Sequence, residues 1–187
     1  MFLRFGLSNY MAEDVEKIHT HCMSHGYVLP TVYQGNYNAF ARILEESLFP
    51  TLRRLGISFY AYSPIAGGLL AKSKQQIVDG SGRFQPGSAY WKLYVCENVL
   101  DALVTWEDVA TDAKCCRGEL AYRWVAFNSH LQGEFGDAIV IGANGVAQLA
   151  QTLQWLEKGP LDKSTCAKID KLWDQVKPDA PLDVFHG

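Results

Sequence analysis

The chain repeats one pattern four times: a short apolar or β-branched run is followed by a stretch whose apolar residues have helical spacing. We expect strands over residues 2–8, 27–34, 58–63 and 138–142. Alternating strands and helices favour parallel strands with the helices outside, because parallel neighbours need a crossover connection. A length of 187 residues suits one domain.

The helical stretches differ in how clearly they end. We expect helices over residues 11–24, 40–55, 92–105, 117–130, 146–157 and 161–176. Pro50 should kink the second helix, and Gly56 should end it in a left-handed conformation. Residues 72–90 show no periodicity, so we expect a long loop that is functional or mobile. The unbroken apolar run 138–142 is typical of a strand buried on both faces.

The charge and hydropathy of the chain exclude several partners. A net charge of −3 gives no electrostatic reason to expect nucleic acid or an anionic membrane surface. No apolar run approaches the roughly 18 residues of a membrane span. The first eight residues lack the apolar core and cleavage site of a signal peptide, so we expect a cytoplasmic protein.

Two groups of residues suggest chemistry that we weigh and set aside. The five cysteines form no CxxC pair, so we expect reduced thiols, although Cys115-Cys116 beside Arg117 could hold a thiol of lowered pKa. His21 and His25 have the i, i+4 spacing of metal ligands, but no third ligand is near in sequence. We expect no metal site.

Polar residues stand where the expected strands end. In an α/β barrel, these carboxyl ends and the loops after them build the ligand face. Amides and a hydroxyl can pair with a carboxamide, an aromatic ring offers a stacking face, and a helix N-terminus binds phosphate. The pattern predicts a cofactor site, although 58–70 alone could be a tight corner without a ligand. These residues are Ser8, Asn9, Gln34, Tyr62, Ser63, Gly142 and Asn144.

Several segments resemble the aldo-keto reductases, and most closely the branch of the aflatoxin aldehyde reductases. The resemblance covers nearly the whole chain in order. Its segments are Phe5-Gly6-Leu7-Ser8-Asn9, Leu29 to Asn38, Leu48-Phe49-Pro50, Phe59 to Leu70, Gly82-Arg83-Phe84, Arg123-Trp124, Gln132-Gly133, and Asp137 through Leu149.

The resemblance implies an NADP(H) site with assigned residues. Ser8, Asn9 and Gln34 would hold the nicotinamide carboxamide, and Tyr62 would stack on the ring. Ser63 and the backbone around Ile65 and Gly67 would face the pyrophosphate. The segment 142–152, with Gly142, Asn144 and Gln148, would meet the 2′-phosphate and adenine, and Arg83 matches an arginine of the substrate loop.

The sequence departs from the family pattern in two ways. Asn144 and Gly145 replace serines, and Thr152 replaces an asparagine, which should weaken a 2′-phosphate site. The first strand also corresponds to the fifth strand of the family's barrel. We therefore find no match for the family's catalytic Asp, Tyr, Lys and His, and reduction by this chain alone is not expected.

The same correspondence predicts half of a TIM-type (β/α)8 barrel, with about four parallel strands and outer helices. Such a half would leave two unpaired edges and an exposed inner face. We expect a homodimer to cover them. A flattened four-stranded sheet with rearranged helices is the alternative.

The sequence leaves three hypotheses about function. The first is an enzyme that isomerises, dehydrates or cyclises a carbonyl-bearing, polyketide-like small molecule, because a pocket that positions its substrate supplies much of the rate. The second is an NADP(H)-dependent reductase completed by another chain. The third is a non-catalytic binding or partner protein. The candidate catalytic residues are Tyr33, Tyr37, Tyr62 and Arg83, with Gln34 and Asn36 beside them.

Overall fold

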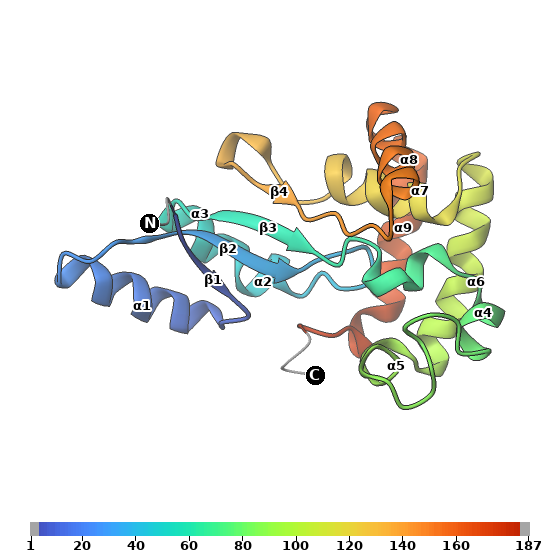
Figure 1. Cartoon of the computed structure of the whole chain (residues 1–187), viewed down its shortest axis with the longest axis horizontal. Helices are drawn as coiled ribbons and strands as arrows, with labels where there is room; N and C mark the ends of the chain where they lie inside the picture. The colour runs from blue at the N-terminus through green and yellow to red at the C-terminus, as the bar shows by residue number, and fades with distance from the viewer. Residues whose placement is uncertain (1–3, 184–187) are drawn as a thin grey trace.

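The computed structural model describes residues 4–183 and shows an α/β fold (Figure 1). Its one sheet, within these residues, has four parallel strands in the order in which they occur along the chain. The predicted fold class, four parallel strands with helices as in half of a (β/α)8 barrel, is confirmed. The strands are β1 (Phe5–Ser8), β2 (Pro30–Asn36), β3 (Ser58–Tyr62) and β4 (Ala138–Ile139).

The helices lie in two groups (Figure 1). The first contains α1 (Ala12–Ser24), α2 (Leu44–Ser47) and α3 (Phe49–Leu55). The second contains α4 (Lys74–Val78), α5 (Ala89–Tyr94), α6 (Glu97–Asp112), α7 (Arg117–Arg123), α8 (Val146–Glu157) and α9 (Lys163–Val176). A 3₁₀ segment, Ala66–Ala71, follows β3, and a π-helical turn, Trp124–Asn128, continues α7.

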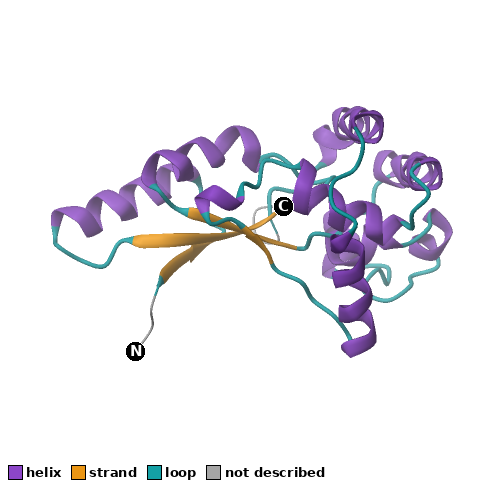
Figure 2. Ribbon diagram, turned by 90° about the horizontal axis from the view of Figure 1, so that it is seen from above, coloured by secondary structure: helices purple, strands orange, loops and turns teal. Residues whose placement is uncertain are grey.

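The two faces of the sheet have different surroundings. Side chains of Leu7, Tyr33 and Phe59, which occupy one register row, are 7%, 1% and 0% exposed and belong to the main core. Figure 2 shows the amino-terminal helices along this side of the strands and no helix along the other side of them. The sheet is therefore buried on one face and open on the other.

The second helical group gathers beyond the end toward which the strands point (Figure 1). Trp106 of α6 is fully buried there, and its indole nitrogen donates to the Leu70 carbonyl at 3.0 Å. This contact ties α6 to the segment after β3. The carboxyl ends of the strands consequently face the loops that precede α4, α5 and α8.

The expected helix over 40–55 is two helices. Leu48, with φ −111°, separates α2 from α3, and Pro50 occupies the first turn of α3, where its missing N–H costs nothing. Gly56 ends α3 with φ 66°, as predicted. The expected loop over 72–90 likewise contains α4, which begins with a capping box between Ser73 and Gln76.

The prediction that residues 138–142 form a strand buried on both faces is wrong. β4 has two residues, Val140 is 39% exposed, and Ile139 is partly buried. β4 pairs with β3 alone among the described residues, so it is an edge strand of the sheet. Within residues 4–183, no helix combines the length and the apolar composition that crossing a membrane would require.

Candidate cofactor-binding face

The residues that alternate toward solvent along β1, β2 and β3 form one surface, here called the open face. Ser8 and Gln34 are register partners, and both are exposed. Tyr62, two residues beyond the register partner of Gln34, lies on the same face and is partly exposed. The structure therefore brings together the three predicted nicotinamide contacts of β1, β2 and β3. The open face consists of Gly6, Ser8, Val32, Gln34, Tyr60 and Tyr62.

Asn9 lies beside this group and has a left-handed backbone conformation. It follows β1 with φ 58°, a left-handed conformation that asparagine tolerates better than most residues. The Tyr62 hydroxyl donates to Asn9 Oδ1 at 2.9 Å. This bond links the ends of β1 and β3 across β2 and fixes the tyrosine ring at the carboxyl edge of the open face.

The corner after β3 concentrates unusual backbone conformations. Ser63 and Ala66 have φ of 54° and 51°, and Gly67 and Gly68 have φ of 65° and 107°. Left-handed conformations at non-glycine residues cost about 1–3 kcal/mol each and cluster at ligand sites. The corner is therefore a candidate pyrophosphate contact, as predicted for Ser63, Ile65 and Gly67.

A buried polar group supports this corner from inside the protein. Asn38, which is fully buried, donates from Nδ2 to the Ser63 carbonyl at 3.1 Å and to the Tyr94 hydroxyl at 3.3 Å. The Tyr94 hydroxyl donates in turn to Asn36 Oδ1 at 3.3 Å. Asn38 is a positioning residue that the sequence analysis missed, since a polar residue in a polar-looking loop gives no sign of burial.

Arg83 lies beside the same corner. Its side chain is exposed, and Nη1 donates to the Tyr90 hydroxyl at 3.2 Å while the guanidinium lies over the Tyr90 ring. The Tyr90 ring also packs against Gly67, so closely that a Cβ at Gly67 would lie 2.1 Å from a ring carbon. Arg83 and the corner after β3 are thus connected through Tyr90, which the sequence analysis did not single out.

The structure places Tyr33 and Tyr37 away from the open face, contrary to the expectation that they cluster there. Tyr33 points to the helix side and donates to the Tyr10 carbonyl at 2.8 Å, and burial raises its pKa. Tyr37 is fully buried and donates to Glu45 Oε1 at 2.6 Å; burial, and then the Glu45 charge, raise its pKa. Side chains alternate along a strand, so Gln34 and Tyr33 cannot share a face.

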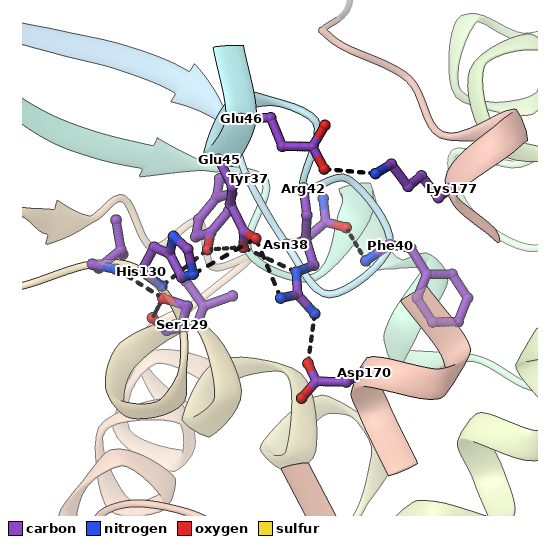
Figure 3. Close-up of polar contacts among 12 residues, drawn as sticks. Tyr37, Asn38, Phe40, Arg42, Glu45, Glu46, Ser129, His130, Asp170 and Lys177 are labelled. Atoms are coloured by element: carbon purple, nitrogen blue, oxygen red, sulfur yellow. Dashed lines mark hydrogen bonds and ion pairs between the residues drawn. The ribbon is translucent and has the colours of Figure 1, made fainter. Parts of the chain in front are cut away.

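Tyr37 instead belongs to a polar cluster between the sheet and α9 (Figure 3). Arg42 forms an ion pair with Glu45 at 2.9 Å and with Asp170 at 2.8 Å. Its guanidinium lies 4.9 Å from the ring centroid of Trp124. Because these polar groups form hydrogen bonds and ion pairs with one another, the cluster connects the sheet to α9 structurally. The prediction that Tyr37 is a catalytic residue is not supported by any side-chain hydrogen bond or ring contact between Tyr37 and the open face among the described residues.

The turn between β4 and α8 offers a partial fit to the adenosine end of a dinucleotide. Gly142, Asn144 and Gly145 are exposed, and no side chain caps the helix. However, Gln148 Oε1 accepts a hydrogen bond from the Asn144 backbone N–H at 2.7 Å, so one donor of the turn is already used. The Thr152 hydroxyl is buried and donates to the Gln148 carbonyl at 3.0 Å. The turn has backbone donors for phosphate, while residues 140–145 include no lysine or arginine.

The two alternative chemistries find little support. The His21 and His25 rings contact each other in a tilted arrangement at a 4.2 Å centroid distance, and no cluster of three metal-ligating side chains occurs in the described part of the chain. The Cys116 sulfur caps α7 by accepting from the Glu119 N–H at 3.4 Å. Burial, and then the Glu119 charge, raise the pKa of the Cys115 thiol to about 11, opposite to the lowered pKa considered from sequence.

Cys115 should consequently be a slow nucleophile. With a pKa of about 11, its thiolate fraction near pH 8 is about 100-fold below that of an ordinary exposed thiol. We expect iodoacetamide to label Cys115 far more slowly in the Cys116→Ser variant than it labels Cys116 in the Cys115→Ser variant. Serine keeps the α7 cap. Equal labelling rates in the folded proteins would contradict the raised pKa.

Arg4 is a further residue of the open side that sequence reasoning missed. Its Nη1 donates to the Tyr60 hydroxyl at 3.0 Å and its Nη2 to Ser58 Oγ at 3.3 Å. Its hydrogen-bond partners among the described residues are neutral. The amino end of the open face is therefore positively charged, whereas its carboxyl end presents hydroxyl, amide and aromatic groups.

The sequence of the chain is similar to a protein-family model and to several named proteins. The model of the aldo/keto reductase family matches residues 3–174. The chain is 40% identical over 184 residues to "Oxidoreductase sirO" of Leptosphaeria maculans, with 96% of the chain and 56% of that protein covered. It is 39% identical to "Aflatoxin B1 aldehyde reductase member 2" of Homo sapiens, with 96% and 53% covered. "Aldo-keto reductase pigE" of Monascus ruber is 31% identical, with 95% and 54% covered.

The chain thus spans about half the length of the curated relatives it matches. The matched half includes the strands that carry the open face and the turn before α8. Because the family model covers most of the chain, the chain belongs to the aldo/keto reductase family.

Proposed function

We propose that the chain binds NADP(H) on its open face and acts on a carbonyl-bearing small molecule as part of an oxidoreductase. The observation that carries the proposal is the juxtaposition of Ser8, Gln34 and Tyr62 on one exposed face of the sheet. The family is typically NADP(H)-dependent, and its matched members are named oxidoreductases or reductases.

The residues present fit the nicotinamide end of such a cofactor. The Ser8 hydroxyl and the Gln34 carboxamide can donate to and accept from an amide, and the Tyr62 ring can stack on a planar heterocycle. The corner from Ser63 to Gly68 would present backbone groups to the pyrophosphate. When bound, the nicotinamide group supplies the hydride; the chain's own residues orient its ring.

The adenosine end fits less well. The α8 N-terminus offers backbone N–H groups and the favourable end of the helix dipole. Asn144 and Gly145 bring neither a positive charge nor a hydroxyl, and Thr152 is buried. We therefore infer a weak 2′-phosphate contact, so that discrimination between NADPH and NADH should be small.

On the substrate side, Arg83 is the group that would orient a carbonyl or carboxylate oxygen. It stands on the loop next to the corner and is held by Tyr90. Tyr62 is a hydroxyl donor at the carboxyl edge. Because this hydroxyl has one proton and Asn9 Oδ1 already accepts it, the Tyr62 oxygen can only accept a further hydrogen bond, and Arg83 is the donor that would polarise a carbonyl.

A second candidate is non-reductive chemistry, such as isomerisation, dehydration or cyclisation of the same carbonyl-bearing substrates. The observation that favours it is the chemistry of the open face itself. Its six residues include hydroxyl, amide and aromatic groups and neither a lysine nor a carboxylate. Such a face can position a substrate and polarise its carbonyl without a strong proton donor.

One assay separates these candidates. The chain, co-purified from its own cells with any chain that completes it, is incubated with NADPH and a panel of small aldehydes and diketones, while NADPH absorbance and product masses are followed together. The oxidoreductase proposal predicts NADPH consumption matched by products two hydrogens heavier. Products formed with NADPH unchanged would support the second candidate. Neither change at any substrate, with the cofactor bound, would contradict both and leave a binding protein.

A further inference from the structure

The sheet ends in two strands that lack a neighbour on one side. Among the described residues, β1 pairs with β2 alone and β4 pairs with β3 alone. Both edges run in the same direction, because all pairings are parallel. Unpaired strand edges expose backbone donors and acceptors and favour pairing with another chain.

Exposed apolar side chains concentrate in the units at these same two edges. At the β1 edge they flank or belong to α1, and at the β4 edge they follow the strand into α8. Val146, on α8, is 85% exposed. Exposed apolar residues gathered in this way mark interaction surfaces. They are Tyr10, Met11, Met23, Tyr27 and Val28 at the first edge, and Val140, Val146, Leu149 and Leu153 at the second.

The surface of α8 has the composition of an interface. No charged residue occurs between Val146 and Leu156, although α8 is largely exposed over this length. Thr152 is the one residue of this helix that is fully buried. A solvated surface helix ordinarily carries charges on its outer face, whereas interface cores are depleted of them.

We propose that a second copy of this chain covers both edges, with β1 of each copy pairing with β4 of the other. A two-fold axis parallel to the strands preserves their direction, so two such pairings give eight parallel strands in a closed ring. Four parallel strands are half of that number. A two-fold axis perpendicular to the strands would instead produce antiparallel pairs at the edges.

The pairing also completes the site. In the single chain, the open face is one exposed wall, and a ligand stacked on Tyr62 would have water on its other side. In the ring, the open faces of the two copies enclose a common interior. The proposal concerns assembly and goes beyond the proposed function. A chain that dimerises without binding NADPH would be distinguished from one that binds NADPH without dimerising, because mass and cofactor binding are measured independently.

The first test is the mass of the purified chain by light scattering during gel filtration. We expect twice the chain mass of 20.9 kDa at about 100 µM, well above a micromolar Kd. Val146→Glu should shift the mass to that of the monomer. Because Val146 is 85% exposed and begins α8, an acidic residue there suits the helix dipole of the single chain.

The matched control is Val104→Glu, which places the same charge at a 49% exposed valine of α6, away from both edges. It should leave the dimer intact. A monomeric wild-type chain at this concentration would overturn the proposal. Equal effects of the two substitutions would overturn the assignment of α8 to the interface.

The second test examines how the edges meet. Ser8 of β1 and Val140, the residue that follows β4, lie at the two opposite edges of one copy's sheet, at least about three strand spacings or roughly 14 Å apart, too far for a disulfide. The Ser8→Cys/Val140→Cys variant should therefore form a covalent dimer under mild oxidation, while each single variant and the wild type should form much less. A dimer by mass that gives no such crosslink would overturn the closed ring.

Discussion

Replacing Asp137 by alanine is expected to cost about 3–5 kcal/mol of unfolding free energy. The Asp137 side chain is 1% exposed. Its Oδ1 accepts from the Phe59 N–H at 2.8 Å and from Arg53 Nη1 at 2.9 Å. Its Oδ2 accepts from the Gln132 N–H at 2.9 Å and forms an ion pair with Arg53 Nη2.

The size of this effect follows from what alanine would leave behind. The carboxylate connects α3, β3 and the segment that leads into β4, and its removal leaves a partly buried guanidinium and the N–H of the buried Phe59 without their acceptor. Leaving such groups unpaired lowers the free energy of unfolding by more than the net stabilisation that the bonds contribute. The edge strand β4 should be the part that loosens first, because its other support is a short pairing with β3.

Urea denaturation at one fixed protein concentration measures this loss. Glu134→Ala is the matched control, since Glu134 is an exposed carboxylate three residues away and should change stability by less than about 0.5 kcal/mol. Asp137→Asn, which keeps one acceptor oxygen, should fall between the two. A loss below about 1 kcal/mol for Asp137→Ala would contradict the structural role given to this residue.

The second large effect concerns the open face. Gln34→Ala should weaken NADPH binding at least about tenfold, because it removes a side chain that can pair twice with the nicotinamide carboxamide, at about 1–3 kcal/mol for the lost bonds. The Gln34 side chain is exposed and lies outside the hydrophobic core, so the fold should remain unchanged.

Gln75→Ala is the matched control for this substitution. Gln75 is an exposed glutamine of α4 whose side chain donates to Asp79 at 2.8 Å. It should leave the Kd for NADPH unchanged. Equal Kd values for Gln34→Ala and wild type would place the cofactor elsewhere than on the open face.

The sequence was sufficient for elements whose signals are local. The helix over 146–157 has the predicted bounds because its apolar spacing and the flanking Gly145 and Gly159 act within the segment. Gly56 ends α3 for the same reason. The grouping of Ser8, Gln34 and Tyr62 also followed, because parallel strands place their carboxyl ends at one edge.

Other features depend on neighbours that a sequence pattern does not contain. The run 138–142 resembles a buried strand, yet burial on both faces requires elements packed over each face, and the sheet is open on one face. Tyr37 resembles a ligand-facing residue by position, but its place is set by its hydrogen bonds with Glu45, eight positions later, and with the distant His130. The role of Asp137 depends on Arg53, 84 positions earlier.

The most direct test of the central claim is fluorescence titration of the purified wild-type chain with NADPH. The open face, with Ser8, Gln34 and Tyr62 at its carboxyl edge, predicts a saturable change in NADPH fluorescence, with NADH binding only slightly differently because the turn before α8 lacks a cation for the 2′-phosphate. The absence of any saturable change up to about millimolar cofactor, a Kd limit corresponding to roughly 4 kcal/mol, would contradict it.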